Sequence, residues 1–230
     1  EILRMARHHR PSVLFLENVK NYLGHDKGRT LATTVRLLER AGYAVSCQVL
    51  NASRFGVAQK RERLYFVCLR RDLGLKDFCF PEPTDDDVVL EDLLLPTEDP
   101  RLGDLVIERS DLRLSSELPT QRENRPLRIG TVGKGGQGER VYSPKGHAIT
   151  LSAYGGGIGA KTGMYLIDGR VRRLHPEECR RIMGFADGFR LHPRQNVCYR
   201  QFGNSVAVPV VKRIFQSIER VLDSKTLQAA

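Results

Sequence analysis

Three short, predominantly apolar stretches limit the first 70 residues to a small set of folds. They are Ser12–Leu16, Val45–Leu50 and Leu64–Leu69. Short, mainly apolar stretches of this length are typical of strands buried on both faces. Helical spacing predicts one helix over residues 1–9 and a second around Leu31 to Leu38, ended by Gly42. Strands that alternate with helices predict an α/β sheet covered on both sides.

The sequence pattern changes after residue 80. Residues 81–126 carry proline, acidic and short apolar clusters, and residues 129–163 are dense in glycine, with short β-like pieces such as Ala148–Leu151. We expect a separate, loop-rich domain there. Helical character returns at Pro176–Met183 and again from Val206 to Leu222, where apolar residues are spaced for one buried stripe.

The charge of the chain favours a polyanionic partner, with nucleic acid as the first candidate. The net charge is +10, although residues 82–99 hold eight acids and no Lys or Arg. We expect this acidic stretch to face away from a phosphate backbone. The five cysteines lack a Cys-x-x-Cys pair, which indicates a reducing compartment rather than a disulfide framework. No apolar run approaches the roughly 18 residues of a membrane span.

Three polar motifs stand in a fixed order along the chain. Glu17-Asn18-Val19 closes the first apolar run, Gln59 to Arg63 precedes the third, and Gly203 to Val206 is expected to open the last helix. A carboxylate at the carboxyl end of a buried parallel strand lies where open α/β sheets bind ligands. The alternative for Glu17 is a side chain that caps the next turn.

Arg61 and Arg63 alternate on a segment expected to be extended, so both guanidinium groups are predicted to project to the same side. Two neighbouring arginines need an anion or a carbonyl-rich partner. Glu17 is the expected balancing charge, and a phosphate or a base carbonyl the expected ligand. A surface ion-pair ladder with Glu62 is the alternative.

Together with the spacing of Arg172, Leu174 and Glu178, these motifs resemble successive blocks of the bacterial DNA cytosine-C5 methyltransferases, over essentially the whole chain. The resemblance implies an α/β fold, the Rossmann-like doubly wound sheet of S-adenosyl-L-methionine-dependent methyltransferases, with its N-terminal part absent. A small, loop-rich β target-recognition domain would be inserted in it. The implied activity is methyl transfer from S-adenosyl-L-methionine to C5 of a flipped cytosine. It would belong to a restriction-modification system at the nucleoid, in the bacterial cytoplasm.

The resemblance also implies domain boundaries and site residues. Residues 1–90 would be the C-terminal part of the catalytic domain, 91–173 the target-recognition domain, 174–203 a hinge and 204–230 the returning helix. The implied catalytic residues are Glu17 on the target base, Arg63 on its O2, and Arg61 supporting Glu17 or the target's backbone. Asn204 and Ser205 would border the cofactor.

The glycine-rich region is similar to the recognition domain of the GCGC-recognising members, which makes double-stranded GCGC DNA the expected partner. By resemblance, Gln137 fills the space left by the extruded cytosine and Arg140 reads guanine, for which arginine is the commonest reader. Thr150 is expected at a phosphate. The second DNA-contacting loop is expected to comprise Tyr154, Gly156 and Gly157.

Two apparent nucleotide-binding motifs are set aside. Gly155–Thr162 resembles a phosphate-binding loop, but Ala160 separates Gly159 from Lys161 and no buried strand precedes it. The glycines at 133, 135 and 138 match the dinucleotide fingerprint, yet the residues at 141–144 cannot open the required helix.

Zinc binding is a third alternative. His175 with Cys179, and His192 with Cys198, lack standard finger spacing. We therefore expect a buried cysteine in a hinge helix and no metal.

Two family motifs are absent from the 230 residues. Members carry a Phe-x-Gly-x-Gly loop for the cofactor and a Pro-Cys loop with the nucleophile, both before Glu-Asn-Val. None of the five cysteines here follows a proline. We expect a C-terminal portion that is inactive alone and is completed by upstream residues or a second chain. A non-catalytic DNA-binding module and a remnant with neither activity stay open.

Overall fold

The computed structural model describes residues 1–75, 77–84 and 86–226, and the chain divides into two compact units. Unit 1 combines Glu1–Asn51, Glu62–Pro83 and the chain from Val211 on, and unit 2 combines Ala52–Arg61 with Thr84–Val210. Each unit has its own sheet and its own buried cluster. The chain passes from one unit to the other after residues 51, 61, 83 and 210. The domain boundaries expected at 90, 173 and 203 stay predictions.

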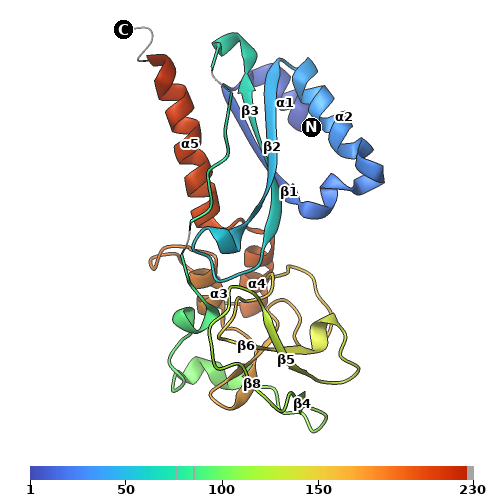
Figure 1. The fold of residues 1–230 in the computed structure, drawn as a ribbon, viewed down its shortest axis with the longest axis vertical. Coiled ribbons are helices and arrows are strands. Elements are labelled where there is room, and N and C mark those ends of the chain that lie inside the picture. Colours follow the sequence, from blue (N-terminus) through green and yellow to red (C-terminus); the bar gives the residue numbers. More distant parts are fainter. Residues whose placement is uncertain (76, 85, 227–230) are drawn as a thin grey trace. The chain divides into compact units, whose positions relative to one another are not determined.

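Unit 1 is a layered α/β structure with a three-stranded sheet. Its elements are α1 (Ile2–His9), β1 (Val13–Val19), α2 (Arg29–Arg40), β2 (Tyr43–Asn51), β3 (Glu62–Arg70) and α5 (Val208–Thr226, whose first three residues belong to unit 2), with 3-10 turns at Lys20–Leu23, His25–Gly28 and Arg71–Leu73. β3 lies between β1 and β2 and is antiparallel to both. Figure 1 shows α1 and α2 on one side of this sheet and α5 on the other.

One face of this sheet forms the core with α1 and α2. Alternate residues of β3 point to this face because successive side chains of a strand point to opposite sides. The fully buried members of the cluster are Ala6, Leu38, Tyr43, Leu64, Phe66 and Cys68.

The opposite face of the sheet packs against α5. Phe15 of β1 stacks on Tyr65 of β3 with ring centroids 5.9 Å apart, and meets Phe215 of α5 edge to face at 5.2 Å. Glu17 is two residues after Phe15, and Arg63 is two residues before Tyr65. The pleat therefore places both charged side chains on this face.

The helices and strands predicted for unit 1 are confirmed, but the expected setting of Glu17 is wrong. Glu17 lies within β1, opposite Tyr65 of an antiparallel neighbour, rather than at the end of a parallel strand. The β1 side chains are half-buried, apart from the exposed Val19, and β2 also carries exposed side chains, so of the three expected strands β3 alone is largely buried. The reason is topological, since β3 returns between β1 and β2 and so runs opposite to both.

Unit 2 is built around a five-stranded sheet in the order β4-β5-β6-β7-β8, in which β6 and β7 are parallel and the other pairs antiparallel. Its elements are β4 (Arg113–Leu114), β5 (Leu127–Thr131), β6 (Arg140–Ser143), β7 (Met164–Ile167), β8 (Arg170–Arg172), α3 (Pro176–Ile182) and α4 (Gln195–Asn204), with 3-10 turns at Ala52–Arg54, Leu90–Leu93, Pro100–Leu105 and Gln137–Glu139. The core of the sheet consists of Ile129, Val132, Val141, Met164 and Val171. The short strands and long loops fit the expected loop-rich β domain.

A buried ion pair joins the end of the sheet to α3. Nη1 and Nη2 of Arg172 donate to the two carboxylate oxygens of Glu178 at 2.9 and 2.7 Å, and the two side chains are 5% and 0% exposed. Glu178 also accepts from the backbone N–H groups of Leu95 and His175. A buried pair is tolerated only when its remaining polar atoms are satisfied in this way. The Arg-x-Leu-x-x-x-Glu spacing therefore places the two partners of the ion pair that joins β8 to α3.

Sequence patterns located some helices of unit 2 and missed another. α3 ends just before Gly184, which has φ +75°, as predicted. The segment expected to be a hinge contains α4, which the sequence did not reveal because its apolar periodicity is weak. Gly203 and Asn204 end α4, and α5 begins at Val208. The prediction that Gly203 to Val206 opens the last helix is therefore wrong.

The β-like piece expected at Ala148–Leu151 forms no strand. It makes a single parallel bridge, between Ala148 and Gln59. The adjoining hydrogen bond of Lys60 N–H to the Ala148 carbonyl is 3.1 Å long. Side-chain contacts, described below, hold the rest of this piece.

Candidate functional site

In unit 1, β1 and β3 bring a carboxylate and a guanidinium together. Nε of Arg63 lies 2.9 Å from Oε1 of Glu17, and the two side chains are 13% and 26% exposed. Nη1 of Arg63 also donates to the Glu62 carbonyl at 2.9 Å. A charge-balanced, partly exposed pair can offer a carboxyl oxygen and a guanidinium N–H to one planar ligand. The two residues are neighbours as expected, and their catalytic role stays a prediction.

Arg61 has partners other than the expected carboxylate. It is 2% exposed, and its guanidinium donates to the carbonyls of Leu151 at 3.1 Å, Gly203 at 3.0 Å and Ser205. All of these residues belong to unit 2. The bonds tie the glycine-rich segment to the end of α4, so Arg61 has a supporting role within unit 2. Its expected contact with Glu17 or the target's backbone stays a prediction.

Unit 2 contains a cavity of about 320 Å³ lined by three stretches of sequence, at 137–138, 149–156 and 159–163. Four of the expected DNA contacts line it, namely Gln137, Thr150, Tyr154 and Gly156. Tyr154 is 78% exposed, and Gln137 is exposed on a single 3-10 turn. Amphipathic side chains presented in this way are available to a ligand rather than to the core. The fold therefore gathers residues that are distant in sequence around one surface of unit 2.

Arg140 starts β6, opposite Thr131 of β5, and is half-buried. Its Nε is buried and has no hydrogen-bond partner among the described residues. A buried donor without a partner costs free energy, and a side-chain rotation that brings the guanidinium to an external acceptor would recover part of that cost. The O6 and N7 atoms of guanine are acceptors of this kind.

Thr150 makes a contact within the protein that was not expected. Its hydroxyl donates to the Lys60 carbonyl at 2.5 Å, beside the bridge of Ala148 and Gln59. Because a hydroxyl has one proton, this bond leaves none for a phosphate oxygen. A phosphate contact at Thr150 would have to use the backbone N–H instead.

Two residues that line the same cavity were missed. Lys161 has φ +76°, a strained value for a residue with a side chain, and its Nζ donates to Oδ1 of Asn196 in α4 at 2.9 Å. Ser152 donates from Oγ to the Tyr154 carbonyl at 2.6 Å and so shapes the exposed turn. A lysine inside a glycine-rich loop is the sequence signal for this position, although the same pattern also resembles a phosphate-binding loop.

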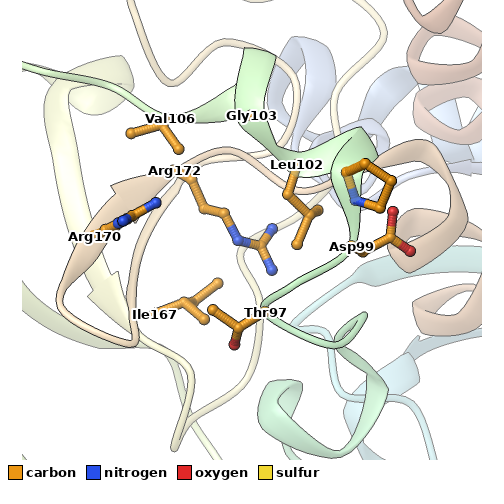
Figure 2. A pocket seen from close by; sticks show the side chains of 9 residues that line it. Thr97, Asp99, Leu102, Gly103, Val106, Ile167, Arg170 and Arg172 are labelled. Carbon is orange, nitrogen blue, oxygen red and sulfur yellow. The ribbon is translucent and has the colours of Figure 1, made fainter.

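A second cavity, of about 210 Å³, lies between β8 and the 3-10 turn Pro100–Leu105 (Figure 2). Hydrogen bonds from the Arg101 guanidinium and N–H hold the pKa of the Asp99 carboxyl well below its usual range. The Arg172 guanidinium in the same lining is paired with Glu178. The charges of Asp99 and Arg172 are therefore already paired within unit 2, whereas the buried Nε of Arg140 has no hydrogen-bond partner among the described residues.

Four of the five cysteines are poor candidates for a nucleophile. Burial raises the pKa of the Cys47, Cys179 and Cys198 thiols, and that of Cys68 to about 12. Cys79 is exposed. A thiol that stays protonated reacts slowly, because the thiolate is the reactive form.

The residues considered for zinc have other partners. His175 caps α3 by accepting the N–H of Glu177 at Nδ1, and the thiol of Cys198 donates to the His192 carbonyl. Over the described residues, no three or more His, Cys, Asp or Glu side chains are grouped to hold a metal ion. In the same part of the chain, no helix combines the length and apolar character needed to cross a bilayer.

A family model for C-5 cytosine-specific DNA methylases matches residues 1–220. The chain belongs to this family. It is 47% identical over 225 residues to the Type II methyltransferase M.HhaI of Haemophilus parahaemolyticus, covering 98% of this chain and 68% of that protein. It is 34% identical to the Type II methyltransferase M.NlaX of Neisseria lactamica, covering 97% and 68%. The methylase chain thus spans about two thirds of the length of these relatives.

Solved structures show the same fold. An Entamoeba histolytica methyltransferase, EhMeth, superposes with a TM-score of 0.67 at 14% identity, covering 92% of this chain and 63% of that one. A putative DNA modification methyltransferase encoded within an E. coli prophage gives 0.64 at 18% identity, covering 96% and 72%. Together with the family match, these structures confirm the expected fold class of S-adenosyl-L-methionine-dependent methyltransferases.

Membership of the methylase family implies S-adenosyl-L-methionine as the cofactor. The side chain of Asn204 is exposed at the end of α4, so its amide can both donate and accept hydrogen bonds there. Ser205 is half-buried, and its hydroxyl donates to the Phe202 carbonyl at 3.0 Å, which leaves its oxygen as an acceptor. Both residues fit the edge of a site for a polar amino-acid and ribose ligand.

Proposed function

We propose that the protein methylates C5 of cytosine in double-stranded DNA, within GCGC, as the modification enzyme of a type II restriction-modification system. The carrying observation is the arrangement of Gln137, Thr150, Tyr154 and Gly156 around one cavity. These residues come from the region that resembles the GCGC-recognising members. The 47% identity to M.HhaI supports the same conclusion. Such an enzyme would act at the nucleoid, in the bacterial cytoplasm.

In this proposal the target cytosine leaves the duplex and meets the Glu17–Arg63 pair. Glu17 hydrogen-bonds N3 and the exocyclic amine, and Arg63 contacts O2. Their 2.9 Å contact supports this role, because each side chain holds the other in a fixed orientation. S-adenosyl-L-methionine supplies the methyl group when bound, and Asn204 and Ser205 lie at the border of its site.

Recognition of the sequence is assigned to unit 2. Gln137 occupies the space that the flipped cytosine leaves and pairs with the orphan guanine, because an amide can both donate and accept. Arg140 reads guanine with the guanidinium whose Nε is unpaired. These contacts offset the few kcal/mol that unstacking a base costs.

The nucleophile is proposed to come from outside the 230 residues, in upstream sequence or a second chain. This rests on the raised pKa values of four thiols and on the absence of a Pro-Cys pair from the sequence. The test is methyl transfer to GCGC DNA by this chain and by a longer one that includes a Pro-Cys loop. Activity is expected only from the longer protein, and equal activity from both would refute the assignment.

Sequence recognition is tested by binding to a GCGC duplex and to duplexes with one guanine replaced. Arg140→Ala is expected to relax the guanine preference by roughly 1–3 kcal/mol, and Gln137→Ala to weaken binding of the flipped state. Arg125→Ala is the control, because Arg125 is an exposed arginine of unit 2 that pairs with Glu123. Equal loss on all sequences would contradict the assigned roles.

A non-catalytic, sequence-specific DNA-binding module is the second candidate. The presence of the recognition residues in a chain without a Pro-Cys pair favours it. Under this alternative the longer protein would bind GCGC DNA with the same preference and transfer no methyl group.

A further inference from the structure

Two glycine-rich loops of unit 2 meet backbone to backbone at Gly138. A Cβ built on Gly138 would overlap the carbonyl oxygen of Gly156 and would lie 3.4 Å from Cα of Gly157. The Gly138 carbonyl accepts the N–H of Gly159 at 2.8 Å. A backbone atom cannot rotate away as a side chain can, so a larger residue at 138 would have to push the loops apart.

The need for glycine at 138 comes from this close approach and not from the backbone conformation. Gly138 is not among the glycines with positive φ, whereas Gly157 on the facing loop has φ +89°. A Cβ on Gly157 would itself come within 3.2 Å of the Gly138 carbonyl oxygen. The two loops therefore fit together only with glycine on both sides.

Both loops carry an exposed residue that lines the 320 Å³ cavity. Gln137 is the sequence neighbour of Gly138, and Tyr154 is two residues before Gly156. If each loop moved independently, binding DNA would cost the ordering entropy of both. Contact at Gly138 removes part of that cost, because ordering one loop orders the other.

We propose that Gly138 is a positioning residue that couples the two loops, so that Gln137 and Tyr154 engage DNA as one rigid unit. The DNA part of this inference rests on the proposed function. The contact between the loops belongs to the protein itself and can be tested without DNA.

The first experiment measures hydrogen exchange of the whole chain without DNA, in the peptide covering residues 154–163. Gly138→Ala is expected to speed exchange there roughly two- to tenfold, the effect of losing one net hydrogen bond. Gly188→Ala is the control, because nothing lies within 4 Å of a Cβ at Gly188 and its φ is not positive. An unchanged exchange rate of residues 154–163 in Gly138→Ala would refute the coupling. An equal increase in the exchange rate of residues 164–172 would also refute it, because it would indicate general destabilisation.

The second experiment measures affinity for a GCGC duplex by fluorescence anisotropy. Gln137→Ala and Tyr154→Ala are combined in the parent and in the Gly138→Ala background. In the parent, the fold-change in Kd of the double variant should differ by at least about twofold from the product of the two single fold-changes. In the Gly138→Ala background, the fold-change in Kd of the double variant should equal that product. Multiplicative effects in both backgrounds would refute the coupling on DNA. No preference of the parent for GCGC over scrambled DNA would instead refute the proposed function and leave the exchange result standing.

Discussion

Glu17 and Arg63 hold each other in place on the α5 face of the unit 1 sheet. Their side chains are only 26% and 13% exposed, so the cost of desolvating both charges offsets much of their attraction and the pair adds little to stability. The ion pair instead orients the two side chains, since each charged group holds the other in one position.

Replacing Glu17 tests that orientation chemically. Glu17→Gln keeps the shape and removes the charge, so methyl transfer by the longer protein is expected to fall about 10²–10³-fold, the usual cost of losing one electrostatic contact to a transition state. Glu39→Gln is the control, because Glu39 is an exposed residue that lies 3.8 Å from Arg71. Activity of Glu17→Gln within about threefold of the parent would contradict the role.

The Arg172–Glu178 pair differs from the Glu17–Arg63 pair because both of its side chains are almost fully buried. Glu178→Ala leaves Arg172 charged and uncompensated, so the free energy of unfolding measured with urea should fall by about 3–5 kcal/mol. The double variant Arg172→Met with Glu178→Leu should lose less, since it removes both charges. Glu123→Ala, which breaks an exposed pair with Arg125, should cost less than about 1 kcal/mol. A double variant as unstable as Glu178→Ala would show that charge burial is not the cause.

At the scale of elements, α3 depends on a neutral histidine. His175 accepts the Glu177 N–H at Nδ1, and burial, followed by the charge of Arg101, lowers its pKa below the ordinary 6.5. Burial also lowers the pKa of His147. Both groups take up a proton more readily in the unfolded chain, so their stabilising contribution is complete above about pH 6.5 and decreases as the pH falls.

We therefore expect the melting temperature to fall as the pH is lowered from about 7 to 5. His175→Asn keeps a side chain that can cap the helix but does not titrate, so its pH dependence should be shallower. Thermal denaturation by circular dichroism at a series of pH values measures both. An identical slope in parent and variant would mean that His175 does not contribute.

Other elements show where sequence patterns succeed. Strands and helices of unit 1 follow apolar periodicity, which is a local property, and they appear as predicted. Apolar periodicity does not predict α4 or the conformation of residues 148–151. The apolar stripe of α4 is weak, and 148–151 is held by long-range contacts with Lys60 and Arg61 that no local pattern contains.

At the scale of the whole molecule, the net charge of +10 predicts DNA binding that weakens steeply with salt. Lys134 is exposed and lies three residues before Gln137 in the sequence. Lys134→Ala should reduce the slope of log affinity against log salt by about 0.9 if this lysine neutralises one phosphate. Gln137→Ala should lower affinity without changing the slope. Anisotropy titrations between about 50 and 200 mM salt measure both, and an unchanged slope for Lys134→Ala would exclude it as a phosphate contact.

The sequence by itself determined the family, most helices and strands, and the residue types that the chemistry needs. These follow from short motifs and periodic patterns, which depend only on neighbours along the chain. Tertiary structure alone decided which partners the residues have. Arg61 binds three carbonyls of unit 2, β3 runs between β1 and β2, and Gly138 touches the facing loop. Each of these contacts joins segments far apart in sequence, and their geometry is set only when the chain packs.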